Sequence, residues 1–154
     1  MIIWIDADSC PKQVRELVCR TGIRLNLEVQ FVANHTIPIP QNKLFIMTLA
    51  NTSPDAADDY IVEHVSHPDL VITRDIPLAK RLVDKNIMVL NDRGTVYTEK
   101  NINERLSMRN LMFELYNNGI YPERTGQFGK KEVQEFANAL DREVNKRLKM
   151  IQTQ

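Results

Sequence analysis

Hydrophobic and polar positions along the chain follow two alternating patterns. Short apolar runs at residues 2–5 and 70–73 are typical of strands that are buried on both faces of a sheet. Residues 25–33 alternate apolar and polar side chains, which also predicts a strand. Elsewhere, apolar residues recur every three or four positions, as on the buried face of a helix. The predicted strands are residues 2–5, 25–33, 44–49, 70–73 and 87–90, and the predicted helices are residues 11–21, 56–65, 77–84, 103–117 and 130–150.

The alternation of strands and helices predicts an α/β fold, in which right-handed crossovers join the strands of a mostly parallel sheet. We expect one three-layer domain over residues 1–154, with a core sheet of about five strands at 1–99 and a helical extension at 100–154 packed on it. Gly22 is expected to end the first helix. The loop at residues 34–42 is short for a crossover between parallel strands, which usually needs a dozen residues or more.

The composition is that of a globular protein, with 43% hydrophobic and 26% charged residues. No apolar run is long enough to span a membrane or to form a signal peptide, so we expect a cytoplasmic protein without a membrane partner. Residues 1–99 carry 10 basic and 13 acidic side chains, a net −3, whereas residues 100–154 carry 10 and 7, a net +3. This distribution is compatible with acids that hold a metal ion and a basic extension that contacts phosphates.

The two cysteines do not indicate a cysteine-based site. Cys10 and Cys19 form no Cys-x-x-Cys motif and no cluster with histidine, which argues against a structural zinc site or a disulfide framework. Cys10 precedes a predicted helix, a position that favours a reactive thiolate, but the arginine spacing of a tyrosine-phosphatase loop does not follow it. We therefore expect Cys10 to be a packing residue, and the scattered histidines, His35 among them, to lie at the surface.

Four carboxylates are the strongest candidates for chemistry. Asp6 and Asp8 directly follow the first predicted strand, and Asp75 follows the strand at residues 70–73. In open α/β sheets, ligands bind beyond the carboxyl ends of the strands. The fourth candidate comes from a helical wheel of residues 56–65, which places Asp58 among the apolar positions and its neighbour Asp59 on the opposite side. A charged side chain on the buried face of a helix is costly unless it is paired or binds a cation.

Carboxylates that are brought together repel one another unless they share a proton or hold a metal ion. An all-oxygen site of this kind suits Mg²⁺ or Mn²⁺. A bound divalent ion would stabilise the charge that develops during cleavage of a phosphodiester. The leading hypothesis is therefore metal-dependent phosphodiester hydrolysis at Asp6, Asp8, Asp58 and Asp75.

A purely structural interpretation competes with this hypothesis. Asp8 and Asp75 each precede a helix that a proline begins, where a carboxylate caps backbone amides and meets the positive end of the helix dipole. Asp92 lies in a predicted turn and is interpreted as a turn residue. Basic residues of the extension are candidates for phosphate contacts, although a solvated helix face also explains them: Arg105, Arg109, Arg124, Lys130 and Lys131.

Several short motifs also occur together in chain order, and their joint occurrence is highly specific. They are Ile-Trp-Ile-Asp6-Ala-Asp8-Ser-Cys10-Pro11, Val32-Ala-Asn34, Ala57-Asp58-Asp59-Tyr-Ile61-Val62, Leu70-Val-Ile-Thr73-Arg-Asp75-Ile-Pro77-Leu-Ala79, Asn91-Asp-Arg93-Gly94, Tyr97-Thr98, Arg105-Leu-Ser-Met-Arg109 and Phe136-Ala-Asn-Ala-Leu-Asp141. On these motifs, the chain from residue 1 to about 147 resembles the bacterial YaiI/YqxD family, which has no characterised function.

The resemblance implies a sheet domain similar to PIN-like nucleases, in which acids at strand ends bind Mg²⁺ or Mn²⁺ and cut RNA. It implies metal-binding and catalytic roles for the same four acids. Residues in these motifs that we expect to contact the substrate are Asn34, Thr73, Arg74, Arg93, Arg105 and Arg109.

The chain departs from the family pattern at three places. Family members often carry alanine where this chain has Arg74 and proline where it has Asp92. The glycine-rich run before the last helix is thinned here to Arg124-Thr-Gly126-Gln-Phe-Gly129, which weakens the case for anion binding by that loop.

Two other functions remain open. Asp6-Ala-Asp8 after an apolar strand also matches the nucleophile and acid/base pair of a haloacid-dehalogenase-like phosphatase, although Asp58 on a helix does not fit that mechanism. The alternative is a non-catalytic module that binds RNA or a nucleotide and whose acids only cap helices. A covalent phosphoryl group on Asp6 would distinguish the phosphatase from the nuclease.

Overall fold

A five-stranded parallel sheet forms the centre of the molecule. The computed structural model describes residues 1–122 and 127–153, and its strand order is β3-β2-β1-β4-β5. The register pairs Ile5 of the central strand with Phe31 on one side and Ile72 on the other. This architecture confirms the predicted parallel α/β sheet. The strands are β1 (Ile2–Asp6), β2 (Glu28–Ala33), β3 (Phe45–Leu49), β4 (Leu70–Ile72) and β5 (Met88–Leu90).

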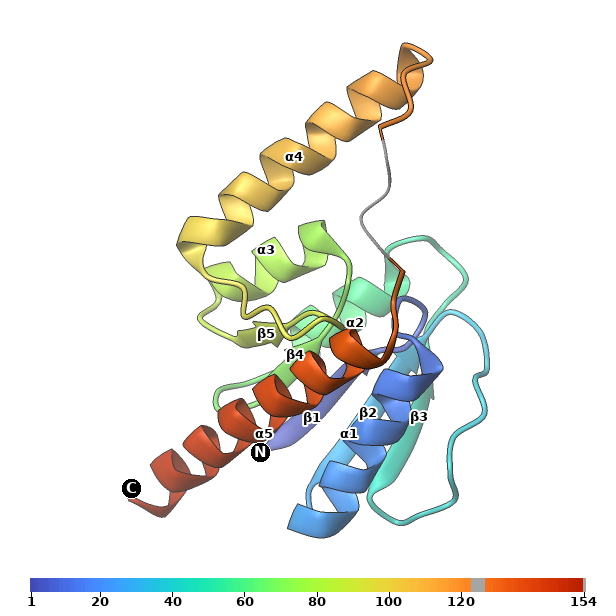
Figure 1. The fold of residues 1–154 in the computed structure, drawn as a ribbon. Helices are drawn as coiled ribbons and strands as arrows, with labels where there is room; N and C mark the ends of the chain where they lie inside the picture. The colour runs from blue at the N-terminus through green and yellow to red at the C-terminus, as the bar shows by residue number, and fades with distance from the viewer. Residues whose placement is uncertain (123–126, 154) are drawn as a thin grey trace.

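Helices cover both faces of the sheet, which makes the domain three-layered (Figure 1). Side chains of β1 alternate between the two layers: Ile3 and Ile5 pack with α1 and α5, and Trp4 packs with α2 and α3. The predicted helical extension consists of α4, which packs on α3, and α5, which packs beside α1. The helices of the described residues are α1 (Lys12–Leu25), α2 (Ala56–His64), α3 (Ile76–Asp84), α4 (Glu99–Asn117) and α5 (Lys130–Gln152).

The connection between β2 and β3 contains no helix, yet the two strands are parallel. Residues 34–44 cross from one end of the sheet to the other as an irregular segment. Ile37 of this segment is buried in the core cluster that also contains Phe31 and Phe45. The segment thus supplies the apolar cover that a crossover helix usually provides.

The first helix is longer than predicted because Gly22 does not end it. The helix continues to Leu25, and Asn26 takes the left-handed conformation with φ 55° that closes the last turn. Gly22 is buried within the helix, where an added Cβ would lie 2.9 Å from Cγ2 of Val29. The glycine is therefore explained by close packing of α1 on β2. The second strand begins at Glu28 because the preceding residues belong to the helix and its cap.

The fourth helix begins at Glu99, earlier than the predicted residue 103. Thr98 caps it: the Thr98 hydroxyl accepts a hydrogen bond from the Asn101 amide at 3.2 Å, and the Asn101 side chain accepts one from the Thr98 amide at 2.8 Å. This reciprocal pair is a capping box. Among the described residues, no helix combines the length and the apolar character that crossing a membrane requires.

Candidate functional site: an acid cavity at the sheet edge

The strand order changes direction between β1 and β4, because the chain leads from β1 to β2 and β3 on one side and later to β4 and β5 on the other. Such a switch point opens a crevice at the carboxyl ends of the strands. A cavity of about 170 Å³ lies there, and we call it the acid cavity. It is lined by Asp6, Asp8, Ser9, Asn34, Pro54, Ala57, Asp58 and Asp75. The fold thus brings all four predicted acids to one cavity.

Asp6 is the most buried of the four acids, with 4% of its surface exposed. Its Oδ2 atom accepts hydrogen bonds from the hydroxyls of Thr73 at 2.7 Å and Ser9 at 3.0 Å. No hydrogen bond from the described residues reaches its Oδ1 atom. Burial raises the pKa of Asp6, the two hydroxyl donors oppose that rise, and the nearby carboxylates of Asp75 and Asp8 add to it. Asp6 is therefore a costly buried charge that a cation would stabilise.

Thr73 orients two of the acids. Its side chain is buried, its hydroxyl donates to Asp6, and the same oxygen accepts a hydrogen bond from the Asp75 amide at 2.9 Å. Sequence reasoning predicted a substrate contact for this residue. The structure instead shows a hydroxyl that is engaged within the protein, which gives Thr73 a positioning role.

Asp75 caps α3, as the structural interpretation predicted. Its Oδ1 atom accepts a hydrogen bond from the Leu78 amide at 2.9 Å. The side chain nevertheless also lines the acid cavity, and its charge raises the pKa values of Asp6 and Asp58. Capping thus accounts for one carboxylate oxygen and leaves the contribution of Asp75 to the cavity intact.

Asp8 does not cap α1, so the capping prediction is wrong for this residue. The N-cap of α1 is Pro11, and no side chain caps it. Asp8 Oδ2 accepts a hydrogen bond from the Asn34 amide at 2.8 Å, and Asp8 Oδ1 lies 3.0 Å from Nδ1 of His35. His35 was expected at the surface and is exposed, but its pairing with Asp8 was not predicted. Both carboxylate oxygens of Asp8 therefore serve to tie the loop after β1 to the loop after β2.

The helical wheel separated Asp58 from Asp59 correctly. Asp58 lines the acid cavity, whereas Asp59 is exposed and pairs with Arg81 at 2.9 Å. Burial raises the pKa of Asp58 to about 7, and the carboxylates of Asp75, Asp6 and Asp55 contribute to the rise. Asp58 is thus a carboxylate that is half protonated near neutral pH and faces other acids.

An unsatisfied acceptor completes the cavity. The side-chain Oδ1 atom of Asn34 is buried and has no hydrogen-bond partner among the described residues. Such an atom is costly unless a ligand, an ion or a water supplies the missing interaction. Together with the carboxylates it forms an all-oxygen donor set, which suits a hard cation such as Mg²⁺ or Mn²⁺.

The carboxylates of the acid cavity do not converge on one point in the way that a complete set of metal ligands does. Within the described part of the chain, no three His, Cys, Asp or Glu side chains are arranged as a ready-made set of metal ligands. Mg²⁺ does not require such a set, because it retains several waters and is often bound by one or two carboxylates. The cavity therefore fits a hydrated ion better than a fully dehydrated one.

Arg74 and Asp92, two of the three departures from the family pattern, are partners. Nε and Nη2 of Arg74 donate to Oδ2 of Asp92 at 3.0 and 2.6 Å, and the Asp92 side chain is only 4% exposed. Asp92 was interpreted as a turn residue, and this pairing was not predicted. The turn closes from the Gly94 amide to the Asn91 carbonyl at 3.2 Å, which places residue 92 where type I turns favour proline. Alanine at 74 and proline at 92 would thus be a compatible uncharged alternative.

The remaining predicted substrate residues lie at different distances from the acid cavity. Arg109 of α4 lines an adjacent depression with Ser9, Arg74 and Asp75. Arg93 lies against the start of α5, where its Nη1 atom is 3.7 Å from Oε1 of Glu132. Arg105 is exposed on α4. Arg124 and its two following residues lie outside the described residues.

Cys10 is a packing residue, as predicted. It is 6% exposed and belongs to the core cluster under α1. Burial raises the pKa of its thiol to about 12, which outweighs the nearby Arg15 guanidinium. The thiol is therefore not a nucleophile at neutral pH.

Comparisons with known proteins show the family of the chain. Residues 4–146 match a family model described as "Uncharacterized BCR, YaiI/YqxD family". The UPF0178 protein of Treponema denticola is 52% identical over 149 residues, which cover 97% of this chain and 95% of the relative. The UPF0178 protein of Syntrophobacter fumaroxidans is 45% identical over 150 residues, which cover 97% and 98%. No solved structure matches the chain. The chain therefore belongs to the YaiI/YqxD family of uncharacterised bacterial proteins.

Proposed function

We propose that the chain is a metal-dependent phosphodiesterase that cleaves RNA at the acid cavity. The observation that carries the proposal is a cavity that has more buried oxygen acceptors than hydrogen-bond donors. Asp6, Asp58 and Asp75 line it beside the unpartnered Oδ1 atom of Asn34. A divalent cation would interact favourably with all of these oxygen atoms at once.

The roles of the residues follow from their surroundings. Asp6 and Asp75 would hold Mg²⁺ or Mn²⁺, which when bound supplies stabilisation of the negative charge developing on the phosphodiester. Asp58, with its pKa raised to about 7, is suited to accept a proton from the attacking water at neutral pH. Asp8 would hold the walls of the cavity in place, because both of its oxygens are engaged.

Two arginines support a nucleic-acid substrate. Arg109 and the exposed half of the Arg74 side chain lie beside Asp75 in the adjacent depression. Guanidinium groups next to a metal site are suited to bind the phosphates that flank a scissile bond. RNA as the substrate rests further on the PIN-like sheet domain that the resemblance to the YaiI/YqxD family implies.

The phosphatase alternative finds less support. Its acid/base residue would be Asp8, whose two oxygens are engaged by the Asn34 amide and His35. Among the described residues that line the cavity there is no lysine, which that mechanism also needs. The binding-module alternative gives no reason for Asp6 and Asp58 to line the same cavity as other carboxylates.

The proposal is tested by incubating the chain with fluorescent single-stranded RNA oligonucleotides in Mn²⁺ and in EDTA. We expect cleavage in Mn²⁺, none in EDTA, and loss of cleavage in Asp6→Asn and Asp58→Asn. Asp59→Asn is the matched control, because the neighbouring acid is exposed and paired with Arg81. Cleavage that persists in EDTA or in Asp6→Asn would contradict the proposal. A phosphorylated Asp6 detected by mass spectrometry would favour the phosphatase.

A further inference from the structure

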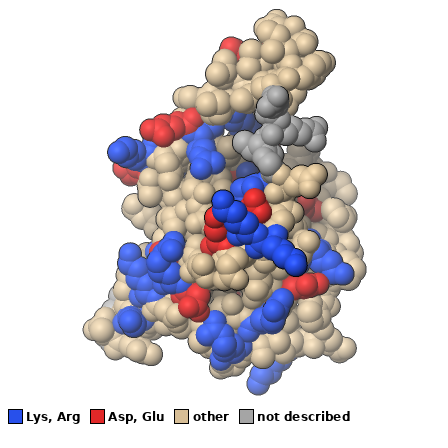
Figure 2. Space-filling model, in the orientation of Figure 1, with Lys and Arg blue, Asp and Glu red and all other residues tan. Residues whose placement is uncertain are grey.

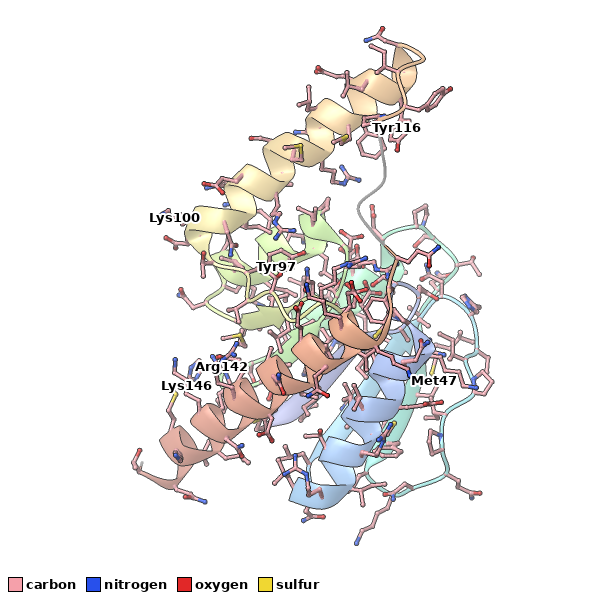
Figure 3. All side chains as sticks on the ribbon, viewed as in Figure 1. Met47, Tyr97, Lys100, Tyr116, Arg142 and Lys146 are labelled. Carbon is pink, nitrogen blue, oxygen red and sulfur yellow. The ribbon has the colours of Figure 1, made fainter. Side chains whose placement is uncertain are left out.

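The far half of α4 and the residues after it extend past the rest of the molecule (Figure 1). We call residues 107–121 the arm. The near end of α4 is anchored, since Ile102 is fully buried in the cluster that contains α3. Tyr116 lies on the extending part, whereas Tyr97 lies within the body (Figure 3). Large apolar side chains of the arm are exposed by 42–73%: Met108, Leu111, Phe113, Tyr116, Ile120 and Tyr121.

The exposed apolar side chains cover a broad face of the arm. At 100° per residue, Leu111, Met108, Tyr116 and Phe113 follow one another around the helix over an arc of about 200°. An apolar face of this width on a helix normally packs against a core or a partner. Contacts within the arm cover little of this surface: the Arg109 guanidinium lies 4.5 Å from the centre of the Phe113 ring, and the rings of Tyr116 and Tyr121 are 5.5 Å apart.

The charge of the arm restricts its partner. Arg109 and Glu114 are its charged residues, so the arm has no net charge. Figure 2 shows the same contrast: charged groups of both signs are spread over the body, and the extending part is almost free of them. A nucleic acid would require a row of cations. An uncharged apolar partner surface is required instead.

The chain itself offers such a surface. Six of the eleven exposed large hydrophobic side chains among the described residues belong to the arm, and the other five are scattered over α1, β3 and the end of α5. The best match for one arm is therefore another arm. Because each arm is neutral, two identical arms meet without electrostatic repulsion.

We propose that two copies of the chain associate through their arms. Taking roughly 200 Å² for each fully exposed large side chain, the six half-exposed residues present roughly 600 Å² per copy. A pair of copies would bury roughly 1,200 Å², the lower end of the range for stable protein interfaces. The arm carries none of the residues that line the acid cavity. Its Arg109, which the proposed function uses for phosphate contact, is not part of the apolar surface, so the inference does not depend on the catalytic function.

The molar mass of the full chain in solution, measured by size-exclusion chromatography with light scattering, tests the inference. We expect twice the chain mass of 17.8 kDa. The combined substitutions Met108→Glu and Leu111→Glu place two buried charges in the pair and should give a single-chain mass. Phe113→Ser with Tyr116→Ser tests the other part of the apolar face without adding charge and should weaken association at least tenfold. Ile23→Glu is the matched control, because Ile23 is an equally exposed apolar residue on α1.

Circular dichroism of each variant verifies that the fold is kept, since all of these side chains are exposed. A single-chain mass for the unmodified protein at hundreds of micromolar would overturn the inference. A pair that survives both double substitutions would also overturn it, because association would then use another face. A monomer whose arm variants lose RNA binding would show that the arm serves nucleic acid instead.

Discussion

Buried aspartates at the two ends of the sheet have opposite surroundings. At the amino ends of the strands, Asp69 is 5% exposed and accepts three hydrogen bonds, from the Ile2 amide at 2.8 Å, the Trp4 indole at 3.0 Å and the Ser66 amide at 3.2 Å. At the carboxyl ends, Asp6 is as deeply buried, yet two hydroxyls are its donors and other carboxylates face it.

This difference distinguishes a structural acid from one that we propose to be functional. Each N–H group that donates to Asp69 stabilises its carboxylate, so the amino ends of the strands need no ligand to satisfy it. At the other end, burial raises the pKa values of Asp6 and Asp58, and neighbouring carboxylates add to the rise, so a proton or a cation would stabilise these two acids. Burial alone is therefore a weak sign of function, and burial next to other carboxylates is a stronger one.

The largest effect on folding is expected at the amino ends of the strands, where Asp69 accepts three hydrogen bonds. Asp69→Ala leaves three N–H donors without an acceptor, at about 1–3 kcal/mol each, so we expect the free energy of unfolding to fall by about 4 kcal/mol. Urea denaturation measures it. Asp84→Ala is the control, because Asp84 is an exposed partner of Lys80 and should change stability by less than about 1 kcal/mol. Equal effects of the two substitutions would remove the contrast between the two acids.

At the other end, Asp6→Asn should abolish activity without destabilising the fold. The amide oxygen can still accept from Thr73 and Ser9, while the raised pKa of Asp6 means that loss of its charge favours the folded state at neutral pH. We expect RNA cleavage to fall by more than about 100-fold, beyond the effect usual for a group that only orients a ligand. A variant that unfolds more readily than the parent would assign Asp6 the same structural role as Asp69.

The Arg74–Asp92 pair beside the acid cavity tests a third arrangement, a buried acid with a charged partner. Arg74→Ala leaves the buried Asp92 carboxylate unpaired, and we expect a loss of about 2 kcal/mol in the free energy of unfolding, because the arginine is half exposed. Adding Asp92→Pro should recover most of that loss. A double substitution as unstable as Arg74→Ala alone would show that the pair is not a replaceable unit.

The smallest effect concerns the pH dependence of stability. The pKa of Asp58 is raised from 3.8 to about 7 in the folded chain, so between these values the folded state holds a proton that the unfolded state has lost. Stability therefore falls as pH rises through this range. Asp58→Asn should remove that part of the slope, adding about 1 kcal/mol near pH 8 for this partly exposed group and nothing near pH 3. Asp59→Asn should leave the slope unchanged.

The hydrophobic pattern was sufficient for the sheet, its parallel strands and the cavity position. Asp58 was identified because helical periodicity distinguishes two neighbouring acids. The misses share a physical cause, which is that they depend on contacts between different elements of the fold. Asp69 joins Trp4, Asp8 joins His35, and packing of the helix against Val29 rather than chain reversal explains Gly22. A sequence pattern reports which face a side chain occupies but does not report its hydrogen-bond partner.

The central claim is that the carboxyl-end acids hold a divalent cation. Its most direct test is anomalous scattering from crystals of the chain soaked in Mn²⁺, with a soaked Asp6→Asn crystal beside it. The account predicts an anomalous peak within the acid cavity, near Asp6, Asp75 and the Asn34 side-chain oxygen, and no peak in the variant. A cavity without Mn²⁺ at millimolar concentration, with Asn34 hydrogen-bonded to an ordered water in its place, would contradict it.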